Sequence, residues 1–455
     1  MVACEEGPAA LLAEVKPSVA LEGAAASGAD EVGEARIHAV TLSGLPWSQK
    51  LLAAVRAANT AAKGPLCTIA TVEPSAQLIR IAGAGPAGLS CAIALARRGR
   101  RAIVSEARAT VGARFTGDLQ VLEDFSEEAD VRELLDEIGI EGDFLGPGLM
   151  QAELFDAKLR RTRVSSTRPF AHFLKRGPEE GTLDSSLLRQ ARASGVEVRF
   201  GERREPEEVD VAATGPRVPD GLAREMTFRT ESPDRVQVLF DSMRAPGGYG
   251  YFFAQGGYAT LGCAVVRDLK RIDRCFEMCA KRFREIADYS VSEERTGYSY
   301  MNFAIPETER SGSTLLAGEA GGFQDYLFGL GIRYAMTTGL LAAISLVEGK
   351  SYDALWEERV GAKRRSSLGA RLLYEGLGDA GLAAFARRGG RRDFRNFLKG
   401  WSRPSFAKEA LAVAARALWR RPENCRHALP DHWCRGRESR DLPAQGPAAP
   451  PGGWA

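Results

Sequence analysis

The sequence has almost no excess of charge of either sign. Among its 455 residues, 61 are Lys or Arg and 59 are Asp or Glu, which gives a formal net charge of +2. Proteins that bind nucleic acid usually carry a basic surplus that neutralises phosphates. The chain also lacks an RNP-like aromatic motif, a zinc-finger spacing and a long basic tail. We therefore expect no nucleic-acid partner.

Long apolar runs are missing as well. Residues 340–347, LLAAISLV, fall well short of the roughly 20 apolar residues that a membrane-spanning helix needs. The first residues include Glu5 and Glu6 but no basic segment of the kind that opens a secretory signal. These absences predict a cytoplasmic protein without a transmembrane helix.

Histidine is scarce, with four residues, and the eight cysteines are scattered rather than arranged as a disulfide framework. We expect reduced thiols and no metal site, because the cluster of ligand-type residues near the C-terminus fits no zinc spacing. His172 is the one histidine in a stretch expected to belong to a substrate domain, and we interpret it as structural. No pair of acid and base residues stands out. The C-terminal cluster consists of Cys425, His427, His432 and Cys434.

A complete dinucleotide-binding unit is predicted at residues 78–106, LIRIAGAGPAGLSCAIALARRGRRAIVSE. A short buried strand is followed by G-x-G-x-x-G, which allows a tight turn, close approach of the backbone to a pyrophosphate, and close packing of the next helix on the strand. The N-terminus of that helix is then free to hold phosphate. The residues expected to contact the cofactor here are Gly83, Gly85, Pro86, Ala87 and Gly88.

The second strand of this unit ends in an acidic residue. Glu106 stands about 20 residues past the glycines, where a carboxylate accepts hydrogen bonds from a ribose. We expect Glu106, with Ala107 beside it, to bind an unphosphorylated ribose. In the loop that follows, Arg114 is expected to pair with the pyrophosphate, and the alternative is a surface arginine in a turn.

This stretch resembles the extended FAD-binding signature of the glutathione-reductase-type flavoproteins, with Ala113 where a second glycine is usual. The resemblance implies FAD rather than a dissociable NAD. It also implies that a later strand, ending at Gly215, passes close to the adenosine half of FAD, whereas a buried strand with a simple glycine turn is the alternative. The positions that carry the resemblance are Gly83, Gly85, Gly88, Ala92, Leu95, Gly99, Glu106, Gly112 and Arg114.

A second stretch of the same kind covers residues 315–343, LLAGEAGGFQDYLFGLGIRYAMTTGLLAA. It resembles the flavin-side motif of the geranylgeranyl reductase and p-hydroxybenzoate hydroxylase group. The resemblance implies that Glu319, where aspartate is usual, holds the ribityl chain, and that the helix start faces the flavin pyrimidine end, where amides stabilise reduced flavin. Arg333 either adds positive charge there or lies on the surface. The residues assigned to the flavin side are Gly318, Glu319, Gly329, Gly331 and Ile332.

Residues 246–262, PGGYGYFFAQGGYATLG, resemble the substrate-domain motif of geranylgeranyl reductases. The resemblance implies that Tyr249, Tyr251 and Phe253 line a substrate pocket that faces the flavin, while the alternative is that these rings are ordinary core. Tyr251 stands where tryptophan is usual and Ala254 where proline is usual, so the substrate is left open.

The predicted fold class is α/β: a discontinuous Rossmann-like FAD-binding domain, an antiparallel-sheet substrate domain and a helical C-terminal region. A basic surplus with interspersed aromatic residues at the C-terminus indicates either a solvated face or contact with an anionic membrane surface. The expected segments are 1–77, a flexible extension; 78–150, 176–218 and 300–350, the FAD-binding domain; 151–175 and 219–299, the substrate domain; 351–420, the helical region; and 421–455, a disordered tail.

We therefore expect an FAD-dependent oxidoreductase that performs hydride chemistry at flavin N5 on a small, apolar substrate of the isoprenoid type. The sequence shows no separate nicotinamide-binding domain with a G-x-G-x-x-G motif of its own. We therefore expect that NAD(P)H approaches the flavin directly or that a protein donor supplies the electrons. One alternative is an aromatic monooxygenase that uses NAD(P)H and oxygen. Another is a non-catalytic homologue stabilised by FAD. A flavin halogenase is disfavoured because the chain has no W-x-W-x-I-P motif.

Overall fold

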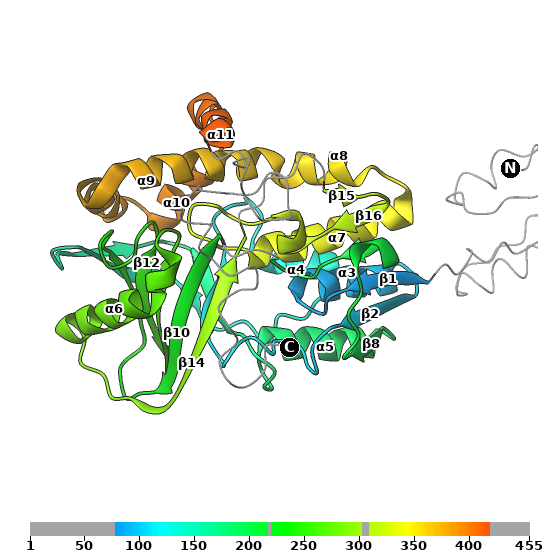
Figure 1. Ribbon diagram of the computed structural model, residues 1–455, viewed down its shortest axis with the longest axis horizontal. Coiled ribbons are helices and arrows are strands. Elements are labelled where there is room, and N and C mark those ends of the chain that lie inside the picture. The colour runs from blue at the N-terminus through cyan, green and yellow to red at the C-terminus, as the bar shows by residue number, and fades with distance from the viewer. Residues whose placement is uncertain (1–77, 217–219, 303–308, 419–455) are drawn as a thin grey trace, which may run out of the picture. The chain divides into compact units, whose positions relative to one another are not determined.

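The computed structural model describes residues 78–216, 220–302 and 309–418 (Figure 1). The expectations for the N-terminal extension, the tail and the Cys425 cluster lie outside these residues. No helix within the described ranges is both long and apolar enough to cross a bilayer.

The nucleotide-binding unit is built around a six-stranded sheet. Its strand order is β15, β16, β9, β1, β2, β8, and every neighbouring pair is parallel except β15 with β16. The strands come from three separate stretches of chain, which confirms the discontinuous α/β architecture. Their bounds are β1 Ile79–Ala82, β2 Ala102–Glu106, β8 Glu197–Phe200, β9 Val211–Ala212, β15 Arg310–Ser311 and β16 Thr314–Leu316.

Two helices that follow glycine turns pack against each other beside this sheet. They are α3 (Pro86–Arg97) and α7 (Ile332–Glu348). Gly339 makes the close approach possible, because a Cβ there would lie 2.2 Å from the Ala87 carbonyl oxygen. Helix α5 (Leu183–Ala193) also packs on α3, and α4 (Val131–Ile138) begins with a capping box. The cap at Asp130 fixes the beginning of α4.

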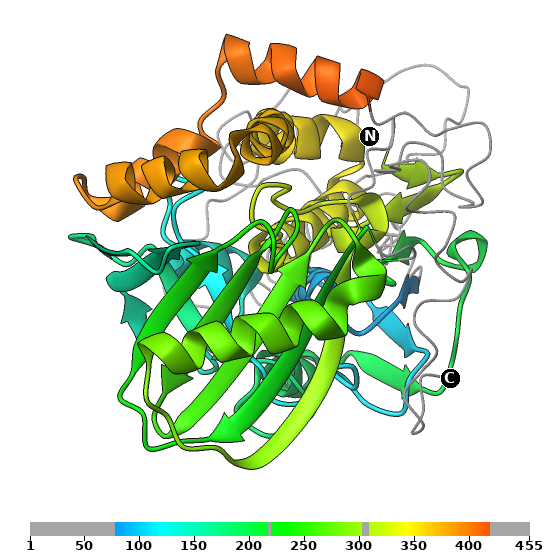
Figure 2. The same ribbon diagram turned by 60° about the vertical axis from the view of Figure 1, so that its left-hand side comes forward.

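The predicted antiparallel wall is part of a seven-stranded sheet with order β14, β10, β13, β12, β11, β5, β6. Only β11 and β5 pair in parallel. Helix α6 (Ile272–Ile286) covers one face of this sheet (Figure 2), where its Cys275, Cys279 and Phe283 are buried. The strands are β5 Gln151–Asp156, β6 Arg161–Ser165, β10 Gly221–Arg229, β11 Arg235–Phe240, β12 Tyr249–Gln255, β13 Tyr258–Val265 and β14 Ser292–Met301.

A three-stranded sheet, β3 (Leu119–Glu123), β7 (Ala171–Lys175) and β4 (Gly148–Leu149), completes the strands found within the described residues. The segment 151–175, assigned from the sequence to the substrate domain, is therefore shared between two sheets. The hydrophobic pattern identified the strands but carried no information about their partners.

The C-terminal region is helical, as expected. Its helices are α8 (Tyr352–Trp356), which continues through a π-helical turn into α9 (Ala362–Gly389), then α10 (Phe394–Ser402) and α11 (Phe406–Leu418).

The composition of this region was misleading in one respect. Phe385, Phe394 and Phe397 do not face outwards, because they are buried in the cluster that packs on the inner face of the seven-stranded sheet, whereas Phe406 of α11 is exposed. Arg364 and Arg395, which belong to the basic surplus of this region, are buried, at 6% and 4% exposure. Arg364 instead bonds to Glu309 in the interior.

Candidate functional site

One continuous cavity of about 320 Å³ extends from the glycine turn after β1 to the aromatic strand β12. Of the residues predicted to bind the cofactor or the substrate, all but Gly88 and Ala107 line it. Segments more than 200 residues apart in the sequence thus meet at one site. Their individual roles remain predictions, but the structure shows that they are neighbours.

The three glycines of the first turn differ in what surrounds them. A Cβ on Gly83 would lie 2.3 Å from the Ala213 carbonyl oxygen, and one on Gly88 would lie 2.0 Å from the Gly83 carbonyl oxygen. At Gly85, no protein atom would lie within 4 Å of a Cβ. Gly83 and Gly88 therefore allow the turn to pack, whereas Gly85 opens onto free space where a ligand can approach the backbone. Gly88 lies beneath the turn, which explains its absence from the cavity wall.

Two helices begin at the wall of this cavity, and neither has a side-chain cap. Helix α3 has Gly85 at its N-cap, and α7 has Gly331. Both Gly85 and Gly331 line the cavity. The first amides of a helix lack partners within the helix and favour negative charge. The cavity therefore offers two positions suited to an anionic or electron-rich group.

Glu106 holds the glycine turn in place from the end of β2. One carboxylate oxygen accepts a hydrogen bond from the Ala84 backbone at 2.8 Å, and the other accepts one from the Arg108 backbone at 2.9 Å. Each carboxylate oxygen has a further lone pair for a ligand hydroxyl. Ala107, which follows, is exposed and does not line the cavity.

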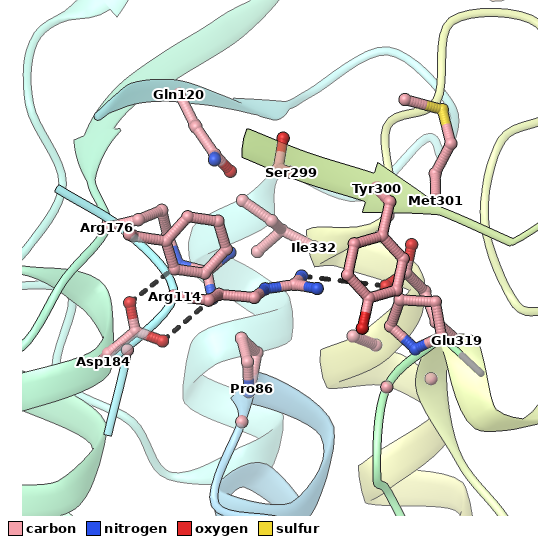
Figure 3. A pocket seen from close by; sticks show the side chains of 18 of the residues that line it. Pro86, Arg114, Gln120, Arg176, Asp184, Ser299, Tyr300, Met301, Glu319 and Ile332 are labelled. Atoms are coloured by element: carbon pink, nitrogen blue, oxygen red, sulfur yellow. Dashed lines mark hydrogen bonds and ion pairs between the residues drawn. The ribbon is translucent and has the colours of Figure 1, made fainter. Parts of the chain in front are cut away.

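Arg114 reaches across the cavity towards Glu319 (Figure 3). Their closest side-chain atoms are 3.8 Å apart, which is an ion pair without a hydrogen bond. Burial raises the pKa of Glu319, and the positive charges of Arg114 and Arg176 oppose that rise. Arg114 is therefore not the surface arginine of the alternative interpretation. Both groups keep free hydrogen-bonding capacity towards a ligand between them.

Arg176 and Asp184 form a buried support on the opposite side (Figure 3). Two hydrogen bonds of 2.8 Å join the guanidinium to the carboxylate, and the Arg176 guanidinium lies 4.1 Å from the ring centroid of Phe115. Asp184 also accepts a hydrogen bond from the Gly177 backbone at 3.0 Å. Nothing in the sequence identified this pair, since neither residue belongs to a motif.

The end of the cavity formed by the aromatic strand contains a carboxyl group that sequence reasoning also missed. Glu225 of β10 accepts a hydrogen bond from the Tyr251 hydroxyl at 2.5 Å and one from the Ser299 hydroxyl at 3.2 Å. Burial, helped by the charge of Asp118, raises the pKa of Glu225 to about 8. The signal was present in the alternation of β10, where Ala223, Glu225 and Thr227 are all buried on one face.

Arg333, for which the sequence left two alternatives, and His172, interpreted as structural, are both buried. Arg333 is 2% exposed and bonds to Asp124 at 3.1 Å and to the Ala129 carbonyl at 2.7 Å, so it is not a surface residue. His172 is buried on β7, with its Nδ1 3.4 Å from the Gly146 carbonyl oxygen. Asp124, Asp130 and His172 place ligand atoms within 4.8 Å of one another, but Arg333 already neutralises Asp124.

Comparisons with known proteins agree with this geometry. The family model described as an NAD(P)-binding Rossmann-like domain matches residues 81–125. Digeranylgeranylglycerophospholipid reductase 2 of Methanothermobacter thermautotrophicus is 29% identical over 171 residues, a match that covers 34% of this chain and 43% of the relative. The chain thus spans less than half the length of this curated relative.

Two solved structures share the arrangement of elements. A geranylgeranyl bacteriochlorophyll reductase-like protein from Thermoplasma acidophilum superimposes with a TM-score of 0.56 at 18% identity, covering 74% of this chain and 95% of that one. A flavin-dependent brominase gives a TM-score of 0.52 at 16% identity, covering 74% and 97%. The chain therefore contains an NAD(P)-binding Rossmann-like segment and has the fold that these two structures share.

Proposed function

We propose that this protein is an FAD-dependent oxidoreductase that reduces an apolar substrate of the isoprenoid type. The observation that carries the proposal is the single cavity that joins two uncapped helix N-termini to the aromatic face of β12. The reductase named in the sequence comparison supports the choice of substrate class.

The residues around the cavity fit FAD. Gly85 leaves open space beside the first amides of α3, as a bound pyrophosphate requires. Glu106 has lone pairs free for ribose hydroxyls, and Arg114 carries the positive charge that pairs with phosphate. Glu319, which also lines the cavity, would accept a hydrogen bond from a ribityl hydroxyl. The amides at Gly331 and Ile332 suit the electron-rich end of the flavin ring.

When bound, FAD supplies hydride transfer, so the chain's own residues bind, orient and exclude water. The rings of Tyr251 and Phe253 stack with centroids 5.1 Å apart, and those of Tyr249 and Tyr251 are 6.0 Å apart. Tyr249 is fixed by donating a hydrogen bond of 2.7 Å to the Phe328 carbonyl, just before the second glycine turn. This aromatic wall provides an apolar surface for a substrate beside the predicted flavin position.

The first experiment is an absorption spectrum of the purified protein, followed by anaerobic titration with NADPH and then NADH. We expect oxidised-flavin bands that bleach with one nucleotide and return, without oxygen, when dispersed digeranylgeranylglycerophospholipid is added. A colourless protein that takes up no added FAD would overturn the proposal. A third outcome is that neither nucleotide bleaches the bands, whereas dithionite bleaches them and the lipid restores them. That result would show that a protein, rather than NAD(P)H, is the electron donor.

The same experiment separates the alternatives. Rapid oxygen consumption on addition of an aromatic substrate would select a monooxygenase. If dithionite reduces the flavin but no added substrate reoxidises it, the result would favour the non-catalytic homologue.

We also propose that any contact with a membrane is electrostatic rather than by aromatic insertion. Arg387, Arg388, Arg391 and Arg392 are exposed around the junction of α9 and α10, whereas the nearby aromatic residues are buried. Basic clusters are attracted to anionic lipid headgroups, and salt weakens that attraction. Co-sedimentation with phosphatidylserine vesicles should therefore occur at low salt and be abolished when all four arginines are changed to glutamine. Binding that persists in the quadruple variant would contradict this assignment.

A further inference from the structure

Three residues form a row across adjacent strands of the seven-stranded sheet. Glu225 of β10 is in register with Gly262 of β13, and Gly262 is in register with Tyr251 of β12. A Cβ on Gly262 would lie 2.2 Å from the Tyr251 Cζ, so the Tyr251 ring lies over this glycine. The missing side chain lets the Tyr251 hydroxyl reach Glu225, two strands away, at 2.5 Å.

This hydrogen bond lies at the wall of the cavity and is shielded from bulk water. Glu225 is 4% exposed and Tyr251 is 7% exposed, yet both line the cavity. The charged groups that act on Glu225 are Asp118, which favours its neutral form, and Arg114, which opposes it. Ser299 of β14 contributes a hydroxyl from the other side. The neighbouring Tyr249 is engaged with a backbone carbonyl and has no carboxyl partner.

We propose that the Tyr251 hydroxyl delivers the proton that completes reduction of a substrate double bond, and that Glu225 replaces that proton. The proposal rests on the proposed function, because reduction of a carbon–carbon double bond adds a hydride to one carbon and a proton to the other. The reduced flavin is the two-electron donor. The proton must come from a group that faces the substrate.

The pair can perform this transfer with every proton accounted for. When Glu225 is protonated, the 2.5 Å contact between the two oxygens reverses its direction: Glu225 donates to the Tyr251 oxygen, which frees the Tyr251 hydrogen to point towards the cavity. As the Tyr251 O–H bond breaks and the substrate C–H bond forms, the Glu225 proton moves to the Tyr251 oxygen. Tyr251 ends as a neutral phenol and Glu225 as a carboxylate, which regains a proton from solvent between turnovers.

This chain has a tyrosine at position 251, where tryptophan is usual in the geranylgeranyl reductases that the segment resembles. An indole N–H donates hydrogen bonds but does not exchange roles with a carboxyl group. Gly262 also has a specific role here, since a Cβ there would collide with the Tyr251 ring without removing either reactive group.

The first test measures the proton directly, without turnover. Difference infrared spectra of the FAD-reconstituted protein between pH 6 and pH 10 should show the carbonyl stretch of a protonated carboxylic acid that disappears with a midpoint near 8. The component with a midpoint near 8 should be missing in Glu225→Gln, which keeps the signal of Glu309, whose pKa is raised to about 7, and it should be retained in Tyr249→Phe. Its absence from the wild-type protein at pH 6 would overturn the proposal.

The second test follows anaerobic reoxidation of reduced flavin by dispersed digeranylgeranylglycerophospholipid in a single turnover. We expect the rate to fall about 100-fold in Glu225→Gln, Tyr251→Phe and Gly262→Ala, as for loss of a general acid. Tyr298→Phe is the matched control, because Tyr298 donates a 2.5 Å hydrogen bond to Asp273 of α6, on the face away from the cavity. This control should reoxidise at the wild-type rate.

The two proposals fail in different ways. If the variants bind FAD and are reduced normally but reoxidise within twofold of Tyr298→Phe, the proton role is wrong and the reductase assignment stands. If the wild-type protein binds no FAD, the reductase assignment and with it the proton role are both wrong, whatever the infrared spectrum shows.

Discussion

The two ends of the cavity are built on different principles. At the nucleotide end, the groups expected to face the ligand are largely backbone amides at helix starts, where Gly85 and Gly331 have no side chains. At the aromatic end, they are side chains from different strands, such as Glu225 and Tyr251, brought together by sheet register. A backbone site depends on local sequence, whereas a side-chain site depends on tertiary pairing. The variants below test that difference, from the largest expected effect to the smallest.

The largest effect should follow from breaking the buried support at the nucleotide end. Arg176→Met leaves Asp184, 1% exposed, without its guanidinium partner, and we expect a loss of about 3–5 kcal/mol in the free energy of unfolding. Urea denaturation measures the loss. The double variant Arg176→Met/Asp184→Leu should recover much of it, because an apolar pair replaces the buried charges. A double variant as unstable as the single one would show that the cost comes from packing on Phe115 instead.

The glycines of the first turn should separate folding from binding. Gly88→Ala forces a Cβ against the Gly83 carbonyl oxygen and should lower the free energy of unfolding by about 1–3 kcal/mol. At Gly85 a Cβ would enter free space, and the backbone is extended, with φ −83° and ψ −177°. The free energy of unfolding of Gly85→Ala should therefore stay within about 0.5 kcal/mol of the wild-type value. FAD affinity should nevertheless fall at least about tenfold, the equivalent of roughly 1.4 kcal/mol. Unchanged affinity would mean that the pyrophosphate does not approach Gly85.

This contrast also explains what could be predicted from the sequence. The strands β1 and β2, helix α3 and helix α7 follow from glycine spacing and hydrophobic periodicity, which are local properties. Register across β10, β13 and β12 is not local, so the contact of Glu225 with Tyr251 over Gly262 could not be inferred. The same holds for Arg176 with Asp184 and for the burial of Arg364, because a charged residue is interpreted as exposed until its partner is known.

The carboxyl group at the aromatic end should also affect stability through pH. Glu225 holds its proton in the folded protein up to a pKa of about 8, while the unfolded chain releases it near 4.5. The folded state therefore binds more protons in this range, and stability should fall as pH rises. The contribution approaches about 1.4 kcal/mol per pH unit between pH 6 and pH 7. Glu225→Gln should remove that slope in urea denaturation at the two pH values, and a slope equal to that of wild type would exclude a raised pKa.

Glu319 should give the smallest effect, because we expect it to contact one ligand group and it already forms an ion pair with Arg114. Its carboxylate lies 3.8 Å from Arg114 at the nucleotide end, where the backbone provides most of the expected contacts. Glu319→Gln keeps the shape but loses the charge, and FAD affinity should fall about fivefold, the equivalent of roughly 1 kcal/mol for one hydrogen bond. Glu319→Asp keeps the charge on a shorter arm and should bind FAD more tightly than the glutamine variant does. Fluorescence quenching of FAD on binding measures both. If the glutamine variant binds FAD more tightly than the aspartate variant, the length of the side chain rather than its charge governs this contact. The ribityl chain would then be positioned by side-chain geometry, as we propose for the substrate at the aromatic end.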